Sequence, residues 1–153
     1  MQSRPIVPCL WFDDQAEPTA QFYSQLFPAG RVTATSRYPE SSDNPKMIAM
    51  DSHIDHGFTF NEAVSLQVMC EDQYDLDRTW DGSSEGGEKG RCGWPKDRFG
   101  VSWQVVPTEI GEWMASEETA ACDRVCAAML RLKKLNIAVL EAAFHGDEPE
   151  GTS

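Results

Sequence analysis

A weak internal repeat limits the folds open to this chain of 153 residues more than any other feature. The segments LWFDDQ (residues 10–15) and VMCEDQ (residues 68–73) align at an offset of 58 residues, with acids and a glutamine in the same places. In each copy a short apolar segment ends in acids placed to cap a helix, and further short apolar segments follow. The sequence therefore predicts a unit of one strand, one helix and further strands that is used twice.

Hydrophobic periodicity extends this prediction to the whole chain. We expect one domain over residues 1–153, made of a first module, a second module and C-terminal helices, at residues 5–62, 63–107 and 108–145. Strands are expected at residues 6–12, 31–38, 47–51, 63–70, 91–94 and 100–107. Helices are expected at residues 13–27, 71–82, 108–116 and 119–144, and a flexible loop at residues 83–90.

Composition excludes several classes of partner and of protein. The formal net charge of −12 argues against nucleic acid and anionic membranes, both of which need basic surfaces. No apolar run approaches the roughly 18 residues of a membrane span, and the N-terminal residues do not resemble a signal peptide. The five cysteines are odd in number and contain no CxxC pair, which favours reduced thiols and a cytoplasmic protein.

The strand expected at residues 100–107 poses a chemical question. Its period-two pattern places Val101, Trp103 and Val105 on one face and Ser102 and Gln104 on the other. An amide buried without a partner costs about 1–3 kcal/mol. Gln104 is therefore expected either to have a hydrogen-bond partner or to face a cavity that something polar enters.

Three segments carry a family resemblance: LWFDDQAEPTAQFYSQLFP, DSHIDHGFTFNEAVSLQVMC and GGEKGRCGWPKDRFGVSWQVVP. The chain resembles the PhnB-like branch of the vicinal oxygen chelate (glyoxalase/bleomycin resistance) superfamily, a branch also called 3-demethylubiquinone-9 3-methyltransferase-like. The resemblance runs from about residue 5 to residue 144. It implies an α+β fold of paired βαβββ modules whose sheets form a cup, usually completed in a homodimer.

The same resemblance implies a divalent metal in the cup, and here the chain departs from the pattern. The glutamate expected on the last strand falls on Gln104, and the histidine expected at the start of the second module falls near Ala63. No histidine stands around residues 5–8. An amide is a poor substitute for a carboxylate toward a hard cation, so no cofactor is expected. The first module also has room for one strand fewer than its relatives.

Strand parity and the family register together predict a cavity lining. The candidate ligand-binding residues are Cys9, Trp11, Ser65, Gln67, Met69, Trp94, Ser102 and Gln104. Mixed apolar walls with a few amides and hydroxyls suit a small organic ligand. The alternative is that these residues fill a closed core, with Gln67 and Gln104 bonded to each other. His53 and His56 are minor metal candidates, because their spacing does not by itself bring them together.

We therefore expect a cytoplasmic homodimer that binds a small organic molecule in its cup without a metal. One alternative is a divalent-metal-dependent lyase, isomerase or dioxygenase that uses His53 or His56. Two others are a methyltransferase, as the family label suggests, and a structural dimer module without a ligand. The identity of the ligand does not follow from the fold.

Overall fold

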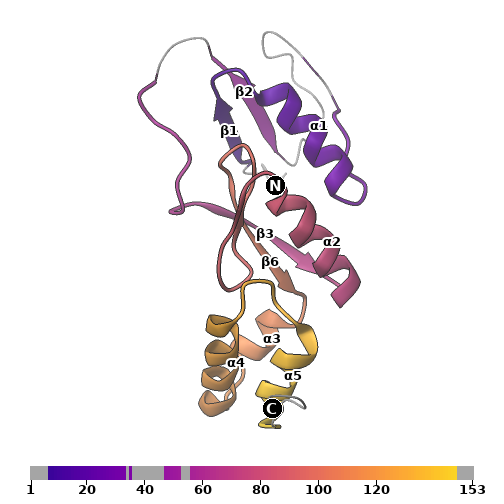
Figure 1. Cartoon of the computed structure of the whole chain (residues 1–153), viewed down its shortest axis with the longest axis vertical. Coiled ribbons are helices and arrows are strands. Elements are labelled where there is room, and N and C mark those ends of the chain that lie inside the picture. Colours follow the sequence, from indigo (N-terminus) through magenta and orange to yellow (C-terminus); the bar gives the residue numbers. More distant parts are fainter. Residues whose placement is uncertain (1–6, 34, 36–46, 53–55, 148–153) are drawn as a thin grey trace, which may run out of the picture. The chain divides into compact units, whose positions relative to one another are not determined.

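The computed structural model describes residues 7–33, 35, 47–52 and 56–147. The chain divides into two compact units, Met1–Phe58 and Thr59–Ser153 (Figure 1). Each unit has its own sheet and its own helix, in the order that the internal repeat predicts.

The first unit contains a parallel pair of strands and one helix. Strand β1 (Cys9–Phe12) pairs with β2 (Ile48–Asp51), and helix α1 (Ala16–Leu26) lies between them in sequence. Leu10 and Phe12 on β1 are buried, whereas the alternate residues Cys9 and Trp11 are exposed. One face of the β1–β2 pair is therefore uncovered within this unit.

The start of α1 is capped by a residue distant in the sequence. The Ala16 backbone N–H donates to Asp51 Oδ1 over 2.7 Å, and the side chain at the N-cap position, Gln15, makes no cap hydrogen bond. The prediction that the acids before this helix cap it is wrong here, because β2 brings the Asp51 carboxylate to the helix end. In the second unit the prediction is confirmed, since Asp72 accepts from the Asp75 backbone N–H over 2.7 Å.

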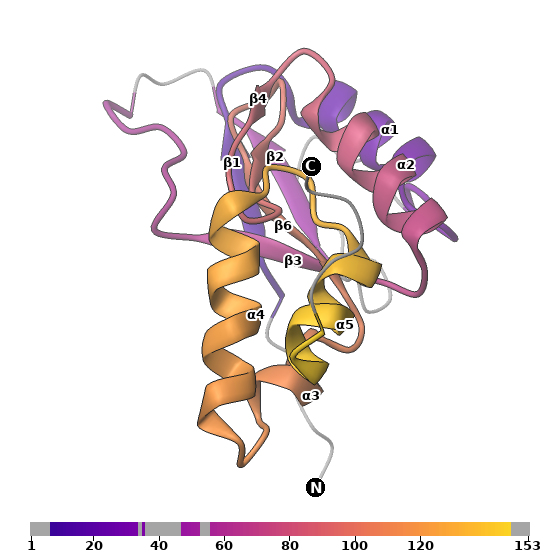
Figure 2. The same ribbon diagram turned by 60° about the horizontal axis from the view of Figure 1, so that its bottom comes forward.

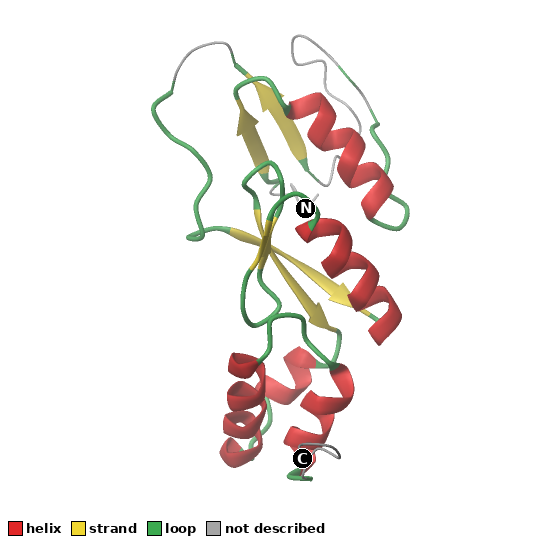
Figure 3. Cartoon of the chain, in the orientation of Figure 1, coloured by secondary structure: helices red, strands yellow, loops and turns green. Residues whose placement is uncertain are grey.

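The second unit begins with a four-stranded mixed sheet and a helix (Figure 3). In chain order its elements are β3 (Ser65–Cys70), α2 (Gln73–Ser84), β4 (Glu88–Lys89), β5 (Pro95–Lys96) and β6 (Ser102–Pro107). The strand order is β3-β6-β5-β4, with β3 parallel to β6 and the other pairs antiparallel. This is one strand, one helix and three strands, as expected for a βαβββ module.

Three helices complete the second unit: α3 (Ile110–Met114), α4 (Thr119–Arg131) and α5 (Ile137–His145). Helices α4 and α5 lie side by side (Figure 2). They share one buried cluster with the sheet and α2, which holds Cys70, Leu76, Trp80, Val105, Val106, Ile110, Trp113, Val125, Leu135 and Leu140. The C-terminal helices are therefore part of the core of this unit. None of the helices in the described part of the chain has the length and apolar character of a membrane span.

The single helix expected at residues 119–144 is wrong, because the chain breaks between α4 and α5. The backbone N–H groups of Cys92 and Gly93 donate to the carbonyls of Leu132 and Lys133, each over 2.8 Å. Leu135 is buried at the break, and Asn136 then caps α5. The apolar stripe continues across the break, which is why periodicity alone suggests one helix.

The expected strand at residues 91–94 is also wrong. These residues form a turn, and the strand paired with β5 lies at Glu88–Lys89, inside the segment expected to be a loop. A two-residue strand is too short to leave a periodic signal. The strand expected at residues 31–38 falls partly outside the described residues, and its described residues, 31–33 and 35, are not in a strand.

Candidate functional site

Helix α2 covers one face of the second sheet, and polar side chains gather on the opposite face. The α2 side carries Val68, Cys70 and Val105, which pack against Leu76 and Trp80 of the helix. Residues directly opposite one another in paired strands point to the same side of a sheet. The register therefore places one polar row across all four strands: Ser65, Ser102, Lys96 and Glu88. One end of this side is covered, because Val106, opposite Met69, is buried in the core cluster. We call the part around the polar row the uncovered face.

Gln67 and Gln104 form the next row of the uncovered face. They are directly opposite in the parallel β3–β6 pair. Gln104 Nε2 donates to Ser65 Oγ over 2.7 Å, and Gln67 Nε2 donates to Gln104 Oε1 over 3.4 Å. The Gln104 amide thus has partners at both ends. Gln67 nevertheless remains exposed and Gln104 half-buried, so within this unit the pair is not enclosed in a core.

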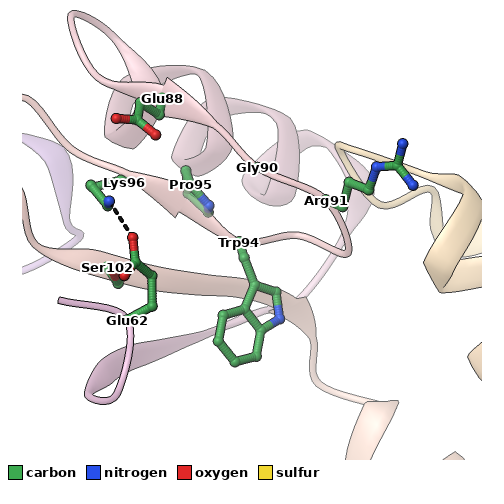
Figure 4. A pocket seen from close by; sticks show the side chains of 8 residues that line it. All are labelled: Glu62, Glu88, Gly90, Arg91, Trp94, Pro95, Lys96 and Ser102. Atoms are coloured by element: carbon green, nitrogen blue, oxygen red, sulfur yellow. Dashed lines mark hydrogen bonds and ion pairs between the residues drawn. The ribbon is translucent and has the colours of Figure 1, made fainter.

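A pocket of about 230 Å³ lies at the row that contains Ser102, Lys96 and Glu88 (Figure 4). It is lined by Glu62, Glu88, Gly90, Arg91, Trp94, Pro95, Lys96 and Ser102. The Ser102 side chain is buried, and its Oγ has no hydrogen-bond partner among the described residues. A buried hydroxyl without a partner is costly unless something that enters the site can bond to it.

An ion pair joins Lys96 and Glu62 at one side of the pocket (Figure 4). Lys96 lies on β5, whereas Glu62 lies in the segment before β3. The hydrogen bond from Lys96 lowers the pKa of the Glu62 carboxyl, and the same contact raises the pKa of the Lys96 ammonium. Glu88, opposite Lys96 on β4, adds a second carboxylate near the same ammonium.

The turn after Lys96 is held by a buried carboxylate. Asp97 Oδ1 accepts from the backbone N–H groups of Phe99 and Val101 over 2.9 and 3.0 Å, and Oδ2 accepts from Trp103 Nε1 over 2.8 Å. These bonds fix β5 against the start of β6. They therefore set the position of Lys96 relative to Ser102.

Close backbone packing shapes the opposite wall of the pocket. A Cβ atom at Gly90 would stand 2.0 Å from the carbonyl oxygen of Trp94, so only glycine fits there. The Trp94 side chain is 39% exposed and extends along the pocket as an apolar wall (Figure 4). Met69, another expected lining residue, is 45% exposed at the end of β3.

The remaining candidates lie in the first unit. Cys9 and Trp11 are on the exposed side of β1, which agrees with the register that aligns them with Gln67 and Met69. The His56 ring lies 4.4 Å from that of Trp11 and 5.2 Å from that of Phe58. The placement of Cys9 and Trp11 in one cavity with the second-unit residues stays a prediction.

The side chains present do not form a typical divalent-metal site. Among the described residues no three His, Cys, Asp or Glu side chains are grouped to hold a metal ion. Around Gln104 the donors are two amides and two hydroxyls, which are weak ligands for such a cation. His56 Nε2 is buried without a partner in the described part of the chain, and His53 lies outside it.

Sequence reasoning missed the charged residues of the pocket lining, which are Glu62, Glu88, Arg91 and Lys96. The sequence feature that could have drawn attention to Lys96 is the segment CGWPKD, part of the most specific block of the family resemblance. The sequence pattern leaves Lys96 between two expected strands and Glu88 in an expected loop, so it assigns neither residue to the face that carries Ser102. Placing both requires the β4–β5 pairing, which the sequence pattern does not contain.

Comparison with known proteins agrees with this architecture. Residues 4–106 match the family described as 3-demethylubiquinone-9 3-methyltransferase. The structure of a PhnB protein from Bacillus cereus, which carries the same methyltransferase name, is 27% identical in sequence to this chain. The TM-score is 0.59, and the alignment covers 67% of this chain and 99% of the Bacillus cereus chain. Protein PA1353 from Pseudomonas aeruginosa shares the fold at 21% identity, with a TM-score of 0.51 over 69% of this chain and 97% of its own.

No functionally curated protein gives a significant match. Helices α3, α4 and α5 lie beyond the matched residues, so they are an addition to the region that defines the family. The family match covers well over half of the chain and is supported by a solved PhnB protein. The chain therefore belongs to the 3-demethylubiquinone-9 3-methyltransferase family, in its PhnB-like branch.

Proposed function

We propose that this protein binds a small organic molecule on the uncovered face of the second unit, through the Gln67 and Gln104 amides and without a resident metal. The observation that carries the proposal is the position of this pair. Two adjacent amides lie on a sheet face that α2 leaves open, and Met69 on the same face remains partly exposed. Trp94, in the lining of the nearby pocket, is also partly exposed. Polar groups that converge among apolar walls are typical of ligand sites.

The core-filling alternative has one point in its favour, the hydrogen bond between the two amides. This bond is long, and only one of the two Gln67 amide atoms takes part in it. An exposed amide can exchange such a contact for one to a ligand at little cost. We therefore favour a binding face.

We also propose that the protein acts as a cytoplasmic homodimer. The resemblance to the glyoxalase/bleomycin resistance fold supports this, since its cups are usually completed in a dimer. Each unit also leaves one sheet face open, with Trp11 at 40% and Met69 at 45% exposure. Large exposed apolar side chains on an open sheet face are typical of surfaces that become covered on assembly.

The residues present support neither enzymatic alternative, the methyltransferase or the metal-dependent lyase, isomerase or dioxygenase. S-adenosylmethionine sites typically use a glycine-rich turn after the first strand of a doubly wound sheet, but residues 13–15 between β1 and α1 are Asp, Asp and Gln. A metal-dependent lyase or dioxygenase would need several ligands beside His56, and the described residues supply no such group. We propose no reaction step through either cofactor.

The test is an NMR titration of the ¹⁵N-labelled full chain with benzamide, benzoate and phenol as probes. Binding should shift the side-chain amide signals of Gln67 and Gln104. Gln104→Met keeps the length of the side chain but removes its polar atoms, so it should weaken probe binding while leaving the melting temperature nearly unchanged. Gln25→Met, an exposed substitution on α1, is the matched control.

The outcomes separate the two readings of the pair. If none of the three probes shifts these signals and Gln104→Met lowers the melting temperature strongly, the pair fills a core and the proposal fails. If the control changes binding as much as Gln104→Met does, the effect is not specific to this face, which also contradicts the proposal.

A further inference from the structure

We propose that the pocket beside the glutamine pair selects a ligand with a single carboxylate on a small flat body, and that Glu62 occupies the place of this carboxylate until the ligand binds. The inference rests on the proposed function, because it names the ligand class of the same face. It assigns roles to Lys96, Glu62 and Ser102.

The first step is the unused hydroxyl in the pocket. Ser102 is only 5% exposed and lines the pocket, and its Oγ has no partner among the described residues. A hydroxyl can donate one hydrogen bond and accept others. A carboxylate oxygen accepts strongly from such a donor, because the bond is charge-assisted.

The second step is the ammonium next to that hydroxyl. Lys96 is directly opposite Ser102 in the antiparallel β5–β6 pair, so both side chains lie on the same side of the sheet. The two groups can therefore contact the two oxygens of one carboxylate.

The third step is the exposure of Glu62, the present partner of Lys96. The Lys96 side chain is 26% exposed and comes from a paired strand, whereas the Glu62 side chain is 65% exposed and comes from a turn. An exposed ion pair contributes little stability, so its opening is not costly. A ligand carboxylate would replace the Glu62 carboxylate and leave the Lys96 charge compensated.

The fourth step concerns the charge and size of the ligand. Glu88 lies opposite Lys96 on its other side, so two carboxylates lie near the Lys96 ammonium. A second cation of the lining, Arg91, extends away from this group (Figure 4). This arrangement disfavours a dianion, since like charges repel. The pocket of about 230 Å³ has the volume of roughly eight water molecules. Together with the partly exposed Trp94 ring, this size suits a compact aromatic monocarboxylate.

The test compares benzoate with its neutral counterpart benzamide and the dianion isophthalate, in NMR titrations of the full chain. Glu62→Gln removes the competing carboxylate and should tighten benzoate binding by about threefold or more, with no such gain for benzamide. Lys96→Met should weaken benzoate by about tenfold and benzamide much less. Glu112→Gln, at an exposed position on α3, makes the same charge change elsewhere and is the matched control.

The result that overturns the inference is a benzoate affinity that Glu62→Gln leaves unchanged or reduces. Equal gains for benzoate and benzamide, or tighter binding of isophthalate than of benzoate, would do the same. Misfolding cannot increase affinity, so the benzoate measurement with Glu62→Gln remains a test even if Lys96→Met unfolds the chain. Should benzamide bind through Gln104 while Glu62→Gln has no effect on benzoate, this inference fails and the proposed function stands.

Discussion

Replacement of Asp97 tests the claim that one buried carboxylate holds the β5–β6 turn. Asp97 is 3% exposed and accepts three hydrogen bonds, two from backbone N–H groups and one from the Trp103 indole. Hydrogen bonds to a charged group contribute about 1.5–3 kcal/mol each, and a buried donor left without a partner costs about 1–3 kcal/mol. Asp97→Ala strands two buried donors, those of Val101 and Trp103, so we expect a loss of about 4 kcal/mol.

Asp97→Asn isolates the indole contact. The asparagine keeps one acceptor oxygen for the backbone donors but turns an N–H group toward the Trp103 N–H. We expect a loss of about 2 kcal/mol in the free energy of unfolding. In a Trp103→Phe background the indole donor is absent, and the further cost of Asp97→Asn should fall to less than about 1 kcal/mol.

The assay is urea denaturation followed by far-UV circular dichroism, which does not depend on the substituted tryptophan. Asp123→Asn, at an exposed position on α4, is the control and should change the free energy by no more than about 0.5 kcal/mol. The reasoning is refuted if Asp97→Asn behaves like this control, or if its cost is the same with and without the indole.

Iodoacetamide at pH 8 should label the exposed Cys126 but not Cys70 in the folded protein, because burial raises the pKa of the Cys70 thiol to about 11. Peptide mass mapping identifies the labelled cysteines, and early labelling of Cys70 would contradict the prediction. Elemental analysis should find no stoichiometric metal, and a chelator should leave the melting temperature within about 1 °C of its original value. The Gln73 amide and the Lys134 ammonium lower the pKa of the Asp77 carboxyl, so this stabilisation is present above the ordinary value of 3.8 and lost as the pH falls through the lowered one. Asp77→Asn should therefore cost about 0.5 kcal/mol at pH 7 and less at pH 2, measured by urea titration at both values; equal costs at both would contradict it.

The sequence carried enough information to predict the long elements of the fold. Strands β3 and β6 alternate apolar and polar residues at period two, and helices α1 and α2 follow acidic segments at corresponding places in the repeat. These signals are local, so each can be read from a short window. The face shared by Ser65 and Gln67, and that shared by Ser102 and Gln104, follow from the same alternation.

The contacts that complete the site are not local, so local patterns alone do not establish them. From the sequence, a bond between Gln67 and Gln104 is only one of two alternatives. Period two indicates which side of its own strand Gln104 lies on but not which residue of β3 stands opposite. The parallel register supplies that residue, Gln67. Lys96 was missed for a similar reason, because β4 and β5 have two residues each and are defined by pairing alone. Register is a tertiary property, set by packing and turn geometry.

The C-terminal helices, which lie outside the family match, support one wall of the site. The break between α4 and α5 provides the carbonyls of Leu132 and Lys133 to the backbone N–H groups of Cys92 and Gly93. Gly93 has a φ of 76°, and a Cβ there would stand 2.6 Å from the Val105 carbonyl, so the turn is pressed against β6. Trp94 follows directly and forms the apolar wall of the pocket. An extension that packs into the core at Leu135 therefore also fixes the backbone from which this wall projects, which makes it a structural support of the proposed binding face.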